Sequence, residues 1–137
     1  MKTICVGLIW LLFGFAGCTG RDIVVPDQLI CVSTLLHTWK LQALQMDGQP
    51  IALSNAQTHM TVSYSQKPRD FNSGSVTTNE LKGSWTLMNC SSLTQVIQLT
   101  SGSTILIDYQ IISLSSSQMH LVYHMNNSKF DEFYTPL

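Results

Sequence analysis

Four histidines are the residues of this chain whose chemistry most readily suggests a metal site. His120 and His124 are the closest pair, and both lie in the alternating segment 119–125. On a strand, residues four positions apart share a face but lie roughly 13 Å apart, which is too far to bind one ion together. The other two, His37 and His59, stand in different segments. We therefore expect no metal and no other cofactor.

Enzymatic motifs do not occur in the sequence. It contains no Gly-x-Ser-x-Gly nucleophile elbow, no phosphate-cradling glycine loop and no His-Glu-x-x-His pair. Asp131 and Glu132 are neighbouring acids in a polar C-terminal tail, where we expect solvent exposure. The aromatic residues of this tail, Phe130, Phe133 and Tyr134, have helical spacing. They predict either one turn that caps the fold or an exposed aromatic handle, and the protein is expected not to be an enzyme.

The N-terminal segment has the composition of an export signal. Lys2 precedes an apolar run from Ile4 to Gly17. This run of about 14 residues is shorter than the roughly 20 that a membrane-spanning helix needs. A short basic start, an apolar centre of this length and small residues at the cleavage point are typical of a signal peptide. Ala16, Gly17 and Cys18 stand at the expected cleavage point.

The segment from Phe15 to Cys18 resembles the lipobox of bacterial lipoproteins, although Phe15 replaces the usual Leu. The resemblance implies that residues 1–17 are removed and that Cys18 is acylated, which would anchor the chain to a membrane. Several acyl chains hold durably because each buried methylene contributes roughly 0.8 kcal/mol. Thr19, where sorting of the enterobacterial type uses Asp to retain a lipoprotein, implies the outer membrane of the cell envelope. The alternative is an ordinary secretory signal in which Cys18 is incidental.

Cleavage and acylation would leave two unmodified cysteines, Cys31 and Cys90, in an oxidising compartment where disulfides persist. A bond between them closes a loop of roughly 60 residues, worth on the order of 4 kcal/mol in the chain-entropy treatment. Two buried free thiols are the alternative, because the sequence does not give the Cα separation that a disulfide requires.

The charge of the chain excludes some partners. Residues 18–137 carry six Lys and Arg against eight acids, and neither sign clusters. This pattern argues against a nucleic-acid groove or a polybasic lipid-binding patch. About 120 residues make one domain of ordinary size. We expect a tether over residues 18–28, with Pro26 opposing an immediate helix, and one domain over residues 29–137.

Alternation of apolar and polar residues predicts that this domain is all-β. A short helical lid is expected over 29–37, and strands then follow, separated by turn dipeptides such as Asp47-Gly48 and Ser101-Gly102. Six clear strands are expected at 37–46, 58–65, 83–89, 94–100, 103–111 and 119–125, with two more around 50–54 and 74–80. Short strands joined by turns, with no long helix between them, predict an antiparallel sandwich or barrel.

Four segments look like the lipocalin-like domains of small bacterial lipoproteins: LLHTWKLQALQMDGQPI, THMTVSYS, LKGSWTLMN and DYQIISLSSSQMHLVYH. Members typically show two Gly-x-Trp strands and a final Y-x-I-x-x-L strand that runs into L-x-L-x-Y. The resemblance covers about residues 35–125. Gly83 fits the second Gly-x-Trp strand, whereas His37 stands where the first glycine is expected. The resemblance implies a small antiparallel up-and-down β-barrel.

The contents of such a barrel decide between two functions. An eight-stranded barrel is either filled by its own side chains or holds one small ligand. Each of two tryptophans, Trp39 and Trp85, is expected to plug the barrel or to line a cavity. Alternation in the later strands adds further cavity or core positions: Tyr109, Leu121, Tyr123, Ile105, Ile107, Ile111, Met119 and Met125.

The first hypothesis is a membrane-anchored barrel that binds a small hydrophobic molecule. The second is a filled barrel that docks to another component of the envelope. A continuous apolar cavity of roughly several hundred Å³ supports the first. A packed interior with an exposed apolar patch supports the second.

Overall fold

The computed structural model of the chain describes residues 26–137. The signal peptide 1–17, the acylated Cys18 and most of the tether 18–28 lie outside the described residues, so these predictions stay predictions. Within residues 26–137, no helix has both the length and the apolar character needed to cross a membrane.

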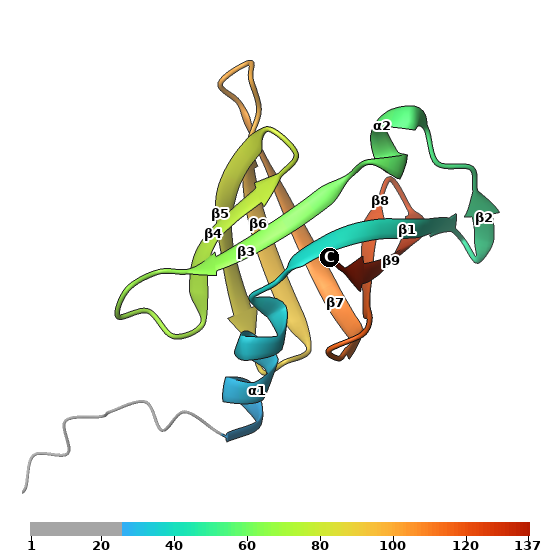
Figure 1. Cartoon of the computed structure of the whole chain (residues 1–137). Helices are drawn as coiled ribbons and strands as arrows, with labels where there is room; N and C mark the ends of the chain where they lie inside the picture. The colour runs from blue at the N-terminus through green and yellow to red at the C-terminus, as the bar shows by residue number, and fades with distance from the viewer. Residues whose placement is uncertain (1–25) are drawn as a thin grey trace, which may run out of the picture.

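Eight antiparallel strands close into a barrel (Figure 1). Each strand pairs with the next one along the chain, and the last pairs with the first. The eight are β1 (Thr38–Met46), β3 (Thr61–Gln66), β4 (Ser73–Thr78), β5 (Leu81–Met88), β6 (Ser92–Gln98), β7 (Thr104–Leu114), β8 (Met119–Met125) and β9 (Ser128–Pro136). The short β2 (Gln49–Ile51) pairs with the end of β1, and the helical turn α2 (Asn55–Thr58) precedes β3. The predicted all-β antiparallel barrel is confirmed.

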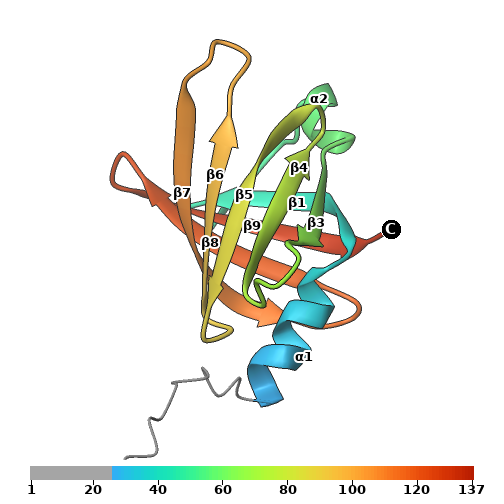
Figure 2. The ribbon, with the colours of Figure 1, turned by 90° about the vertical axis from the view of Figure 1, so that its left-hand side faces the viewer.

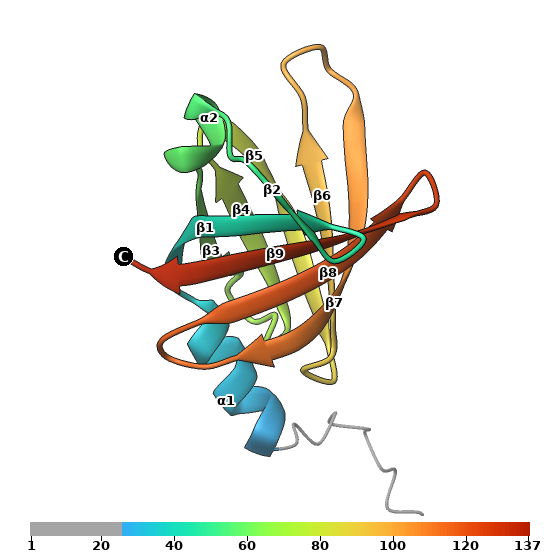
Figure 3. The same ribbon diagram turned by 90° about the vertical axis from the view of Figure 1, so that its right-hand side faces the viewer.

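The C-terminal tail is the main correction to the predicted strands. The spacing of its aromatic residues predicts a capping turn or an exposed handle, but the tail forms β9, which pairs with both β8 and β1 (Figure 3). Asn126 and Asn127 adopt φ angles of 52° and 67°. These left-handed conformations form the tight hairpin turn that joins β8 to β9. The tail therefore closes the barrel.

One end of the barrel is covered by α1 (Pro26–Leu35), as Figures 1 and 2 show. Pro26 begins this helix and does not oppose it, because the fixed φ of proline suits the first helical position. The helix therefore starts before the domain boundary expected at residue 29. A disulfide joins Cys31 to Cys90 in the β5–β6 turn, with the Cα atoms 5.7 Å apart. It holds α1 at the β5–β6 end of the barrel.

Two fully buried tryptophans fill the interior on the α1 side. Trp39 donates its Nε1–H to the carbonyl oxygen of Leu35, and Trp85 donates to that of Ser65, both at 3.0 Å. Gly74 lies opposite Trp85 in the sheet, and a Cβ there would sit 1.9 Å from the Ser65 oxygen and 2.7 Å from the Trp85 Nε1. Glycine at position 74 therefore makes room for the indole, and both tryptophans act as core plugs.

Candidate functional site

A cavity of about 180 Å³ lies inside the barrel, toward the end opposite α1. Its wall includes residues beside the β4–β5 turn and the β6–β7 hairpin, whereas α1 is bonded to the β5–β6 turn. It is smaller than the several hundred Å³ expected of a carrier. The lining residues are mostly apolar: Met60, Val62, Thr78, Leu81, Gln95, Ile97, Leu99, Ile105, Ile107, Tyr109, Tyr123, Glu132 and Tyr134.

Among the described residues of this wall, Glu132 is the one acid, and only 7% of its surface is exposed. The Tyr134 hydroxyl donates a hydrogen bond to Oε2 at 2.7 Å, and the Tyr109 hydroxyl is a second nearby donor. Burial raises the pKa of Glu132, and the two tyrosine hydroxyls offset this effect only in part. Of the described residues that line the cavity, none is Lys, Arg or His. The buried acid therefore has no cation beside it in the cavity.

A second polar pair lies near Glu132. Gln95 donates from Nε2 to the hydroxyl oxygen of Tyr64 at 2.5 Å, and both side chains are buried. Burial, and then the nearby charge of Glu132, raise the pKa of Tyr64 well above its ordinary value. The same two causes raise the pKa of Tyr123 to about 12. These phenols therefore stay protonated at neutral pH and keep their O–H groups as hydrogen-bond donors.

Strand alternation explains why two polar side chains, Glu132 and Gln95, point into the barrel. In β9, Glu132 lies between Phe130 and Tyr134 on the inward face, and in β6 Gln95 lies between two inward apolar residues. The sequence analysis does not predict that either residue points inward, because polar residues are usually exposed. The period of two in the β9 segment was the available signal, and the helical spacing of its aromatic residues obscured it.

The predicted cavity-or-core residues divide between the two roles. Tyr109 and Tyr123 line the cavity, as do Ile105 and Ile107. The remaining members of that set do not line it. Trp39, Trp85, Leu121, Ile111 and Met119 are buried in the core, and Met125 is 52% exposed.

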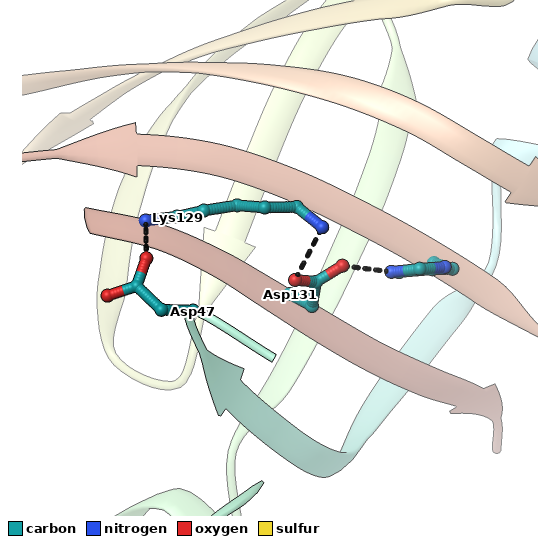
Figure 4. Close-up of polar contacts among 4 residues, drawn as sticks. Asp47, Lys129 and Asp131 are labelled. Carbon is teal, nitrogen blue, oxygen red and sulfur yellow. Dashed lines mark hydrogen bonds and ion pairs between the residues drawn. The ribbon is translucent and has the colours of Figure 1, made fainter. Parts of the chain in front are cut away.

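Asp131 occupies the opposite face of β9 from Glu132. Its Oδ1 lies 2.8 Å from His120 Nε2, and its Oδ2 lies 3.0 Å from Lys129 Nζ. Figure 4 shows Lys129 between Asp131 and Asp47, whose Oδ1 accepts the Lys129 backbone N–H at 2.8 Å. Burial acts to raise the pKa of Asp131, but His120 and Lys129 outweigh it and hold the pKa below its ordinary value. The expected solvent exposure of this acid pair is wrong, since Asp131 is 4% exposed.

Three of the histidines make contacts with different neighbours. His120 contacts Asp131, the Nδ1 of His59 is 2.9 Å from the Asn55 carbonyl oxygen, and His37 packs edge-on against Trp39. In the part of the chain that the structure describes, no three His, Cys, Asp or Glu side chains come together as a group that could hold a metal ion.

Comparison of the chain with models of protein families, with curated proteins and with solved structures gave no match. The resemblance of residues 35–125 to lipocalin-like domains therefore stays a prediction from sequence motifs. The structure itself provides an eight-stranded closed barrel whose apolar cavity contains one buried acid.

Proposed function

We propose that this chain is a non-enzymatic, lipid-anchored protein of the cell envelope that binds a small, largely apolar molecule inside its barrel. The cavity of about 180 Å³ carries this proposal, because its wall is mostly aliphatic and aromatic. Apolar cavities of roughly 150 Å³ bind benzene, so this one fits a ligand of about six to ten non-hydrogen atoms. The ligand is thus smaller than the typical cargo of a wide barrel.

The membrane anchor belongs to the same proposal. Seven residues separate Cys18 from Pro26, the first residue of α1. On that helix, Leu29 and Ile30 expose 45% and 65% of their surfaces. Apolar side chains so close to a lipid attachment point suit the interface of a bilayer, which we propose is the outer membrane. Cys18→Ala should remove the protein from the detergent phase in a phase-partition experiment, and unchanged partition would contradict the anchor.

Ligand binding can be tested on the full chain in phospholipid nanodiscs with labelled isoleucine methyl groups. Addition of 1-hexanol should shift the Ile107 methyl signal, which reports on the cavity, and leave unchanged that of Ile112, which is half-exposed on the same strand and outside the cavity wall. Ile107→Phe should fill the cavity and abolish binding, which is followed in this variant by the methyl signal of Ile97 in the same wall. Ile112→Phe is the matched control, because it adds the same bulk at a half-exposed position on the same strand. A cavity signal that does not move in the unaltered chain would contradict the proposed function.

A docking function is the second candidate, and the outer face of β7 favours it. Leu106 and Ile112 are 62% and 50% exposed there, and Leu106 lies opposite Val96 of β6. A photo-crosslinking amino acid at position 106 would give a discrete protein adduct in intact envelopes under this alternative. The same probe at position 107 would give none, because that side chain faces the interior.

A further inference from the structure

We propose that the cavity selects small primary amines, with the ammonium group against the Glu132 carboxylate and a short alkyl or aryl part against the apolar wall. This inference rests on the function proposed above and adds the chemical class of the ligand. It follows from the charge, the hydrogen bonds and the aromatic rings of the cavity, taken in turn.

The charge of the cavity is unbalanced. Glu132 is 7% exposed and none of the described lining residues carries a positive charge. A buried carboxylate without a cation is costly, and one partner with the opposite charge and good geometry compensates for much of that cost. Asp131, the next acid on the outer face, has Lys129 and His120 within 3.0 Å. Asp131 thus has a cation from the protein, whereas none of the described lining residues gives one to Glu132, and a cationic ligand could provide it.

The hydrogen bonds of Glu132 leave room for such a ligand. Tyr134 donates one hydrogen bond, and Tyr109 is a second nearby donor. An ionised carboxylate offers about four acceptor positions, so about two stay open for the N–H groups of an amine. Charge-assisted hydrogen bonds of this kind are shorter and roughly twice as strong as neutral ones.

Aromatic rings flank the acid. Tyr109 and Tyr123 both line the cavity, with ring centroids 5.4 Å apart and planes at 76°. The face of an aromatic ring attracts a cation within about 6 Å, most strongly where water is excluded. An ammonium in this cavity has two aromatic rings in the wall as well as the carboxylate, whereas an anionic headgroup would be repelled by the carboxylate. The same surroundings disfavour a fatty acid bound with its carboxylate inward.

Three probes of equal chain length separate these chemistries: hexylamine, 1-hexanol and hexanoate. Each is titrated at pH 7.5 into the full chain in nanodiscs of zwitterionic lipid, and the Ile107 methyl signal is followed. Hexylamine should bind about tenfold more tightly than hexanol, because it adds a charge-assisted contact, and hexanoate should not bind measurably. Nanodiscs without protein correct for partition of each probe into lipid.

Glu132→Gln tests the assigned residue. The amide has nearly the same shape but no charge, so hexylamine affinity should fall about tenfold while hexanol affinity stays within about threefold. The matched control is Asp131→Asn, which removes the neighbouring charge outside the barrel and should leave both affinities unchanged. The comparison of the three probes on the unaltered chain does not depend on whether either variant folds.

The outcomes distinguish the two levels of the proposal. If hexanol or hexanoate binds as tightly as hexylamine, the cavity binds ligands but does not select amines, and this inference is overturned. An amine preference that survives in Glu132→Gln would also overturn it. If none of the three probes shifts Ile107, the binding function itself fails.

Discussion

Asp131 and Glu132 are adjacent in sequence and similar in chemistry, yet the barrel gives them opposite properties. Asp131 lies on the outer face of β9 with a lysine and a histidine, and its pKa is lowered. Glu132 lies on the inner face with tyrosine hydroxyls, and its pKa is raised. Both acids are at most 7% exposed, so burial alone does not separate them.

The difference shows that the partners of a buried acid decide whether its pKa is raised or lowered. Consecutive strand residues point to opposite faces. On the outer face of β9, Asp131 is paired with Lys129 and His120. On the inner face, the described partners of Glu132 are neutral tyrosine hydroxyls. Four predictions test this contrast, beginning with the largest expected effect.

Asp131→Ala should lower the free energy of unfolding by about 2 kcal/mol, because it removes the charge-assisted hydrogen bond to His120 and the ion pair with Lys129. Urea unfolding at pH 7 measures the loss. Asp131→Asn keeps the shape of the side chain and should lose less. A loss below about 0.5 kcal/mol for the alanine variant would mean that the outer contacts contribute no more than an exposed ion pair does.

Glu132→Gln should have the opposite sign and raise the free energy of unfolding by about 1 kcal/mol at pH 7.5, since the neutral amide avoids the cost of burying a carboxylate without a cation. The amide oxygen can still accept the Tyr134 hydrogen bond. The measurement is the same urea titration, made without ligand. A clear destabilisation would show that the carboxylate is already balanced inside the barrel.

The pH dependence should separate the two acids most sharply. The raised pKa of Glu132 means that the folded chain binds this proton more tightly, so its contribution is fully present below the unfolded pKa of about 4.3 and is lost as pH rises through the folded pKa. The advantage of Glu132→Gln should therefore vanish in acid. The lowered pKa of Asp131 makes its contribution present above about pH 3.9 and lost as pH falls through the folded pKa. The free energy of unfolding of Glu132→Gln and of Asp131→Ala should be measured between pH 3 and 8 and compared with that of the unaltered chain. As pH rises, the first variant should become more stable than the unaltered chain and the second less stable. Differences that do not change with pH would contradict the contrast.

Lys129→Met should have the smallest effect, a loss of about 0.5 kcal/mol or less in the free energy of unfolding. The Lys129 side chain is 48% exposed, and exposed ion pairs contribute little. Its backbone N–H, which binds Asp47, is unaffected by the change. Addition of 0.5 M salt should reduce the difference further, and a loss as large as that of Asp131→Ala would assign the outer contact mainly to Lys129.

Much of the barrel could be predicted because turns and alternation are local signals. The Asp47-Gly48 dipeptide has φ angles of 52° and 80°, as a two-residue hairpin requires, and Gly102 also has a positive φ. The sequence predicts β4 only as one of two additional strands, around residues 74–80. It is a full strand, and the glycine that weakens its pattern is needed against Trp85.

The cavity could not be predicted in the same way. Its volume depends on how side chains from distant strands pack together, and no local pattern records that packing. Glu132 was hidden for a different reason, since an acid in an inward position contradicts the usual burial preference. Prediction from residue type fails where a site places a charged residue at a core position that is usually apolar.

The disulfide between Cys31 and Cys90 has a consequence for how a ligand would arrive. It fixes α1 at the β5–β6 end, while the cavity lies toward the β6–β7 hairpin. The seven residues of β6 separate these ends by roughly 20 Å at 3.3 Å per residue. If the chain is anchored next to α1, the cavity lies in the half of the barrel farther from the bilayer surface. Occupancy would then follow the concentration of ligand in the aqueous compartment, and not the amount that dissolves in the lipid.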